Sequence, residues 1–114
     1  MNYVEPTLFP LEPIVVPDAR GGTIQERFDA FDRANPWIYN ALVELSRELL
    51  GSGKDRIGMK MLFEVLRWEY LKRTTDEASD FKLSNSYTSR YARRIMAQEH
   101  ELDGIFETRP LVSA

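Results

Sequence analysis

The chain has 114 residues, which fits one domain with a single hydrophobic core. Its formal net charge of −3 argues against a protein that coats nucleic acid without selectivity, because such proteins usually carry a net basic domain. It contains no cysteine, which excludes disulfides and thiolate metal sites.

Residues 1–22 are predicted to form an extended arm. Its four prolines fix φ and remove amide donors, so neither a helix nor a central strand is expected. The arm is too apolar for a solvated linker, and the simpler prediction is that it packs on its own domain. The alternative is packing on a partner, through Leu8, Phe9, Leu11, Ile14 and Val16.

The arm does not resemble a signal peptide, because it lacks a basic start and prolines interrupt its apolar residues. No run in the sequence approaches the roughly 20 apolar residues that a membrane span needs. We therefore expect a cytoplasmic protein with no membrane segment.

The remaining sequence, 23–110, is predicted to be one helical domain. Thr23 and Glu26 have the spacing of a capping box, which should begin a helix that ends near Ala34. The boundary is set by the next two residues, which have the pattern of an N-cap followed by a first helical proline.

This second helix is predicted to begin at Asn35-Pro36 and to run to about Leu50. Its apolar residues recur with the spacing of one buried helical face. Gly51 is expected to end the helix in the left-handed conformation.

A third, central helix is predicted over 57–73. One face is apolar, and Met61, Val65 and Trp68 extend the apolar surface around the side. A helix that is apolar over most of its circumference is usually surrounded by other elements, so burial is expected for these three residues as well. The main face carries Met59, Leu62, Phe63, Leu66 and Tyr70.

A fourth helix is predicted over about 85–98. At 100° per residue, Arg90, Arg93 and Arg94 share one face, and the opposite face is apolar. The short alternating segments 81–83 and 105–109 are predicted to pair as an antiparallel ribbon. The expected fold is mainly α, with four helices and a small two-stranded β-ribbon in a winged-helix-like α+β arrangement.

No catalytic or metal-binding pattern stands out. The single histidine, His100, lies in a polar stretch, whereas a metal site needs several converging ligands. The serines lack a nearby base, and nothing selects a catalytic pair among the eighteen acids. We predict a non-enzymatic protein without cofactor or metal.

The basic fourth helix predicts binding to double-stranded DNA. The segment 54–98 holds ten basic and six acidic residues, a charge of +4, which leaves −7 for the rest of the chain. Arginine, lysine, hydroxyls and helix N-termini are the groups that bind phosphates. The candidate nucleic-acid-binding residues are Lys82, Ser84, Asn85, Ser86, Arg90, Arg93 and Arg94.

Two features weaken the DNA hypothesis besides the negative net charge. The link between the third and fourth helices is about ten residues, whereas a helix-turn-helix uses 3 or 4. In addition, arginines on a surface helix often pair with acids, here for example Glu99 or Glu101.

The alternative prediction is a protein-interaction module. Tyrosine, tryptophan and arginine are enriched in protein-binding hot spots, and this chain has many large rings for its size. Under this hypothesis the arm and the exposed rings bind a host protein or a second copy of the chain.

Three segments together resemble a family of short uncharacterised proteins of bacteriophages and prophages: "FEVLRWEY" at 63–70, "FKLSNSYTSRYARRIM" at 81–96 and "LDGIFETR" at 102–109. The resemblance covers roughly the C-terminal two-thirds of the chain. It implies action in a bacterial cytoplasm, on DNA or on a host protein, and it assigns no catalytic or binding residue.

Overall fold

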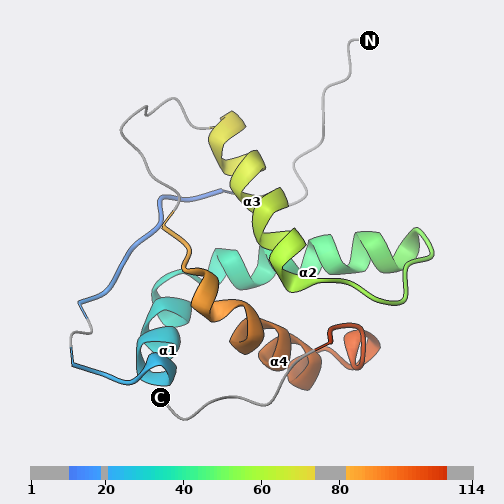
Figure 1. The fold of residues 1–114 in the computed structure, drawn as a ribbon. Coiled ribbons are helices and arrows are strands. Elements are labelled where there is room, and N and C mark those ends of the chain that lie inside the picture. The colour runs from blue at the N-terminus through green and yellow to red at the C-terminus, as the bar shows by residue number, and fades with distance from the viewer. Residues whose placement is uncertain (1–10, 19–20, 74–81, 108–114) are drawn as a thin grey trace.

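The computed structural model describes residues 11–18, 21–73 and 82–107. Within these ranges the protein is all-α, with helices and no strand (Figure 1). The elements are α1 (Ile24–Ala34), α2 (Pro36–Gly51), α3 (Met59–Arg73), the 3₁₀ helix η1 (Asn85–Tyr87), α4 (Thr88–Gln98) and the 3₁₀ helix η2 (His100–Leu102). All four predicted helices are confirmed.

The capping box at the start of α1 is confirmed. The Thr23 hydroxyl accepts from the Glu26 amide at 3.1 Å, and the Glu26 carboxylate accepts from the Thr23 amide at 2.9 Å. The position predicted for the left-handed glycine that ends α2 was wrong by two residues. Gly51 is the last helical residue, and Gly53 is the one with positive φ, 100°. Its amide donates to the carbonyl of Leu50, which closes the helix end.

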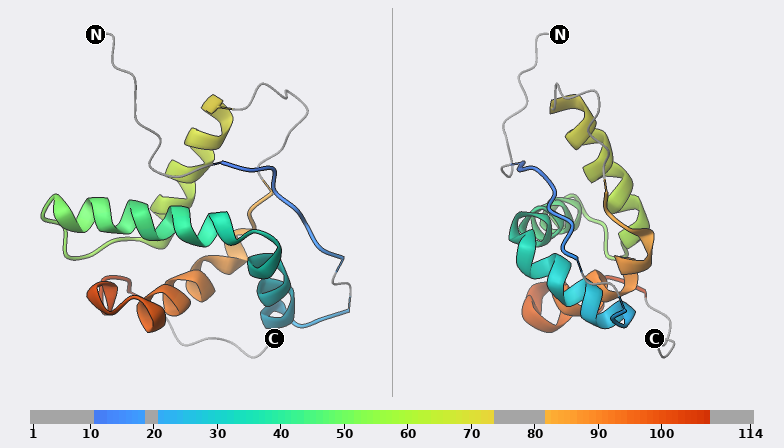
Figure 2. Two further views of the ribbon diagram at one scale, coloured as in Figure 1. Left: turned by 180° about the vertical axis from the view of Figure 1, so that it is seen from behind. Right: turned by 90° about the vertical axis from the view of Figure 1, so that its left-hand side faces the viewer.

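Helix α2 packs against the three other α-helices, and α3 also packs against α4. The ring of Tyr91 on α4 lies at the centre of this core, fully buried. Its centroid is 4.8 Å from that of Phe28 on α1 and 6.0 Å from that of Phe63 on α3, both in edge-to-face geometry. The axis of α3 diverges from α2 toward its C-terminal end (Figures 1 and 2), where Tyr70 still stacks on Trp37 of α2 with ring centroids 6.3 Å apart.

The predicted β-ribbon is not formed by the described residues, which include 82–83 and 105–107. Phe106 instead makes an isolated parallel bridge with Ile57, and the Ile57 amide donates to the Ile105 carbonyl at 2.9 Å. The turn at Gly104, with φ of 83°, brings this segment back to the start of α3, where the Ile57 amide needs an acceptor. Phe81 and residues 108–109 lie outside the described residues.

The side chain of Asn35 holds the arm on its own domain. Its Oδ1 accepts from the Val15 amide at 2.7 Å, and its Nδ2 donates to the carbonyls of Val15 at 2.7 Å and Phe31 at 2.9 Å. Asn35 is the N-cap residue of α2 as predicted, but its side chain makes no capping bond. It is fully buried and links the α1–α2 junction to residue 15 of the arm.

The described part of the arm, 11–18, therefore lies on its own chain. Leu11 and Ile14 pack against the core, as the simpler prediction expects, whereas Val16 points outward and is exposed. The other two candidate arm residues, Leu8 and Phe9, lie outside the described residues.

We expect Asn35→Ala to lower the free energy of unfolding by about 2 kcal/mol, because it removes one buried and two partly buried hydrogen bonds and leaves the backbone of Val15 without these partners. Hydrogen exchange at the Val15 amide should accelerate more than exchange in α2. The matched control is Asn40→Ala, an exposed asparagine on the same helix. Equal stability of the two variants would show that the hydrogen bonds of Asn35 do not hold the arm.

Candidate interaction surfaces

An apolar stripe runs along the outer side of α3. Met61, Val65 and Trp68 are separated by four and three residues, so they lie within about 60° of the helix circumference. They are 47 %, 36 % and 63 % exposed, and Leu71 at the edge of the stripe is 52 % exposed. We call these four residues the α3 stripe.

The prediction that Met61, Val65 and Trp68 are buried was wrong. The other predicted face of α3 is buried as expected, with Leu62, Phe63 and Leu66 fully inaccessible, among others. Burial of that face turns the α3 stripe outward, because the two lie on opposite sides of one helix. The spacing of 61, 65 and 68 already indicated a second, separate face, and Leu71 continues it.

Charged side chains border the α3 stripe. Lys60 is exposed, and the Nε of Arg67 lies 3.4 Å from a carboxylate oxygen of Glu64. The Lys72 amine lies 5.9 Å from the centroid of the Trp68 ring and 3.3 Å from the mostly buried Glu69 carboxylate. Two of these three cations, Arg67 and Lys72, therefore already have a carboxylate partner on α3.

The arginines of α4 have different surroundings. Arg94 is bound by α1, with its two terminal nitrogens each 2.6 Å from a carboxylate oxygen, one from Asp29 and one from Asp32. Its guanidinium carbon also lies 4.6 Å from the centroid of the Phe28 ring. The hydrogen bond from Arg94, opposed by burial, lowers the pKa of Asp29 below its ordinary value of 3.8.

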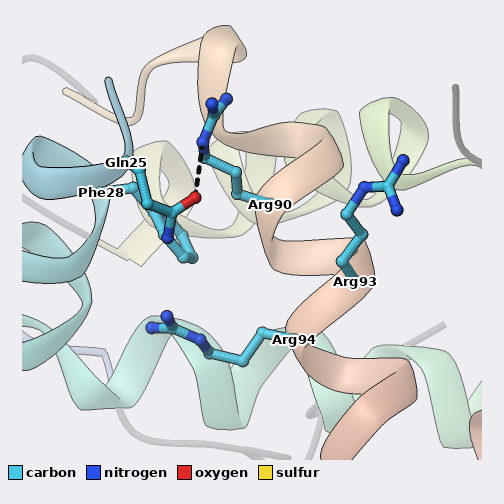
Figure 3. Close-up of a pocket in the computed structure, with 5 residues that line it drawn as sticks. All are labelled: Gln25, Phe28, Arg90, Arg93 and Arg94. Carbon is cyan, nitrogen blue, oxygen red and sulfur yellow. Dashed lines mark hydrogen bonds between the residues drawn. The ribbon is translucent and has the colours of Figure 1, made fainter. Parts of the chain in front are cut away.

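Arg90 is oriented by α1 through one bond, from its Nε to the Gln25 side-chain oxygen at 3.0 Å. Together with Phe28, Arg93 and Arg94, these two residues line an open pocket of about 260 Å³. Figure 3 shows that the guanidinium groups diverge: Arg93 extends away from the other two, while Arg94 points toward α1. The three do not form one flat basic face.

The remaining predicted nucleic-acid-binding residues gather at the beginning of η1. Lys82, Ser84, Asn85 and Ser86 are all exposed. The hydroxyl of Ser84 accepts from the Ser86 amide at 3.2 Å and lies 2.7 Å from the Ser86 hydroxyl, so it caps η1. These groups adjoin the N-terminal end of α4, about two turns from Arg94 along the helix.

The acids suggested as partners of the α4 arginines are engaged elsewhere. Glu99 and Glu101 lie 2.8 Å and 2.6 Å from the Nη2 of Arg47, which joins the end of α4 to α2. The Tyr39 hydroxyl also donates to Glu99, at 3.0 Å. Sequence reasoning missed Gln25, Asp29 and Asp32, because nothing local connects α1 with a helix about sixty residues later.

Among the described residues, no three potential metal ligands of the His, Cys, Asp or Glu type gather in one place. None of the helices in those ranges has both the length and the apolar character to cross a bilayer. Comparisons with protein-family models, curated proteins and solved structures find no match for this chain. The resemblance to bacteriophage proteins thus stays a prediction from the sequence.

Arg94→Ala should destabilise the fold by about 2 kcal/mol, because it leaves two partly buried carboxylates without their cation. The pKa of Asp29 is lowered in the folded state, so its contribution is complete above pH 3.8 and is lost as pH falls below that value. The stability gap between wild type and variant should therefore narrow in acid. Urea unfolding across pH measures it.

The control for this prediction is Lys54→Ala, which removes an exposed cation outside α1. It should change stability by less than about 0.5 kcal/mol. A gap between wild type and Arg94→Ala that stays constant down to low pH would contradict the assigned role of the Asp29 pair.

Proposed function

We propose that this protein is a non-enzymatic protein-interaction module that docks a partner protein on the α3 stripe. The supporting observation is the concentration of apolar exposure on one helix side. In the described part of the chain, six large hydrophobic side chains are exposed, and four of them form this stripe. The other two, Val15 and Val16, belong to the arm.

Scattered exposed apolar residues are ordinary, but a contiguous row that contains a tryptophan marks an interaction surface. Leaving a side chain as large as Trp68 in water forgoes roughly 2 kcal/mol of burial free energy. Tryptophan is also enriched in hot spots, where a few buried anchors carry most of the affinity. The proposed partner is a protein of the bacterial cell, in line with the predicted phage context.

A photo-crosslinking amino acid in place of Leu71 should give a discrete adduct with a partner protein in bacterial cells. The same amino acid in place of Glu48, an exposed residue of α2, should not. Trp68→Glu should reduce the adduct at least tenfold, a fold-change of about the size expected for a hot spot. Adducts that are identical from both positions, or that persist in Trp68→Glu, would contradict the proposed function.

DNA binding by α4 is the second candidate. It is supported by the composition of the segment 82–98, which has four cations and no acid. The Nε of Arg90 donates a hydrogen bond to the side chain of Gln25. Within the described residues, the Arg90 side chain makes no other hydrogen bond or ion pair. A late basic helix is also the order found in winged helix-turn-helix proteins, in which α4 would take the position of the groove helix.

For this candidate, Arg90→Ala and Arg93→Ala should each weaken duplex binding and lower the salt slope by about 0.9. Arg94→Ala should act mainly through lost stability, since its guanidinium already binds Asp29 and Asp32. Fluorescence anisotropy with mixed-sequence duplex over a range of salt measures the slopes, with Arg33→Ala as control. Undetectable binding at low salt, followed by failed selection from random duplexes, would sink this candidate.

A further inference from the structure

We infer that a site centred on Asn35 binds an extended, polyproline-type segment of a partner protein, and that the arm fills this site within its own chain. The site lies at the α1–α2 junction, and the described arm runs past it as an extended trace (Figure 2). It is a second interaction surface, formed by residues other than those of the α3 stripe, and the inference does not depend on the proposed function.

Asn35 presents a fixed amide group to the segment that lies in this site. One hydrogen of its Nδ2 donates to the Phe31 carbonyl at 2.9 Å, and its backbone amide donates to the carbonyls of Phe31 and Asp32. These bonds to α1 orient the side chain without help from the arm. The other Nδ2 hydrogen and the Oδ1 atom face residue 15, as one donor and one acceptor side by side.

This pair of groups recognises the backbone of the bound segment. Both bonds, at 2.7 Å each, are made with the amide and the carbonyl of Val15, while the Val15 side chain is 53 % exposed. An extended residue of any type except proline offers the same amide and carbonyl. The site is therefore tolerant of the side chain at this position, but it requires an extended backbone there.

The side chains of the arm show what the rest of the site accepts. Burial recurs every three residues: positions 11, 14 and 17 are partly buried, and positions 12, 13, 15, 16 and 18 are exposed. Three residues per turn is the period of the polyproline II helix, which has no internal hydrogen bonds and so leaves its backbone groups for Asn35. The expected ligand is an extended segment with apolar residues at i and i+3 and proline at i+6.

The arm is held by contacts that a separate segment can reproduce. They include the packing of Leu11 and Ile14 against the core and the two backbone bonds at residue 15. Before α1 the chain turns at Gly21, with φ of 83°, and no atom would lie within 4 Å of a Cβ at this residue. Because the turn adds no packing at this position, the advantage of the arm over a separate segment is its effective concentration, about millimolar for a short linker.

The same comparison argues against the arm of a second copy as the occupant. That arm would make the contacts that the chain's own arm makes, but at the concentration of the protein in solution, which is normally far below millimolar. A partner protein is not limited in this way. Leu11 and Ile14 are only partly buried, so a segment with larger apolar side chains at these positions can bury more surface and displace the arm.

The test uses a fluorescein-labelled peptide with the sequence of residues 11–18, LEPIVVPD, and two full-length proteins, wild type and the arm variant Leu11→Ser, Ile14→Ser. The variant removes both apolar anchors of the arm and leaves the helices unchanged, which circular dichroism checks. Anisotropy titrations should show the peptide binding at least tenfold more tightly to the arm variant than to wild type, because the competing arm is released.

Two modified peptides locate the contact without altering the protein. N-methylation at the position of Val15 removes the hydrogen that Asn35 Oδ1 accepts, and it should weaken binding at least fivefold, about the effect of one hydrogen bond to a buried group. The matched control is N-methylation at the position of Val16, whose amide makes no hydrogen bond within the described residues, and it should weaken binding less than twofold.

Nuclear magnetic resonance places the peptide in the site. The side-chain amide signals of Asn35 should shift in the arm variant, because the partners from Val15 are lost. They should return toward their wild-type positions when the peptide binds. Signals that are identical in wild type and arm variant would contradict the inference, since Leu11 and Ile14 would then not hold the arm in the site.

Three further results would overturn the inference. The first is equal affinity of the two proteins for the peptide, or no binding to the arm variant at millimolar concentration. The second is equal weakening by the two N-methyl groups, which would show that Asn35 does not read the backbone. The third is a concentration-dependent dimer of wild type in sedimentation that the arm variant abolishes, which would make the arm of a second copy the occupant.

Discussion

The burial of Tyr91 fixes the rotation of α4 about its own axis, and the chemistry of that helix follows from this rotation. The ring sits edge-on to Phe28 and Phe63, which joins α4 to α1 and α3. With this side chain inside, the residue three positions later must lie beside α1, where Asp29 and Asp32 receive its guanidinium. An ion pair with two carboxylates is the consequence for Arg94. The same rotation places Arg90 against Gln25 and sends Arg93 away from both.

A corresponding constraint acts on α3 with the opposite outcome. Leu62, Phe63 and Leu66 fill the core from one side of the helix, and nothing in the described chain covers the other side. Part of the basic surface of α4 is thus bound by side chains of α1. The apolar stripe of α3, in contrast, is exposed to solvent. For this reason the geometry favours α3 over α4 as the docking surface, although the sequence drew attention first to the arginines.

Much of the fold was predictable because it depends on local rules. Caps, prolines and the 3.6-residue period gave the four helices and the buried side of each. The wrong predictions concern which residues, far apart in the sequence, contact each other. Asn35 was correctly predicted as an N-cap residue. Its side-chain amide, however, forms hydrogen bonds with the backbone of residue 15 in the arm. Ile57, not the segment 82–83, pairs with Phe106. No local pattern distinguishes such partners, because each candidate has the same hydrogen-bonding groups.

The exposed side of α3 illustrates the limit of composition more sharply. Apolar residues around most of a helix indicate burial only if enough other elements exist to surround it. Here α2 packs against α1 and α4, and the inner side of α3 packs against α2 and α4. Covering Trp68 therefore needs an additional layer, and the cation of Lys72 over its ring shields only part of that surface. Within the described part of the chain, this excess of apolar surface over covering elements is the observation that supports the proposed interaction module.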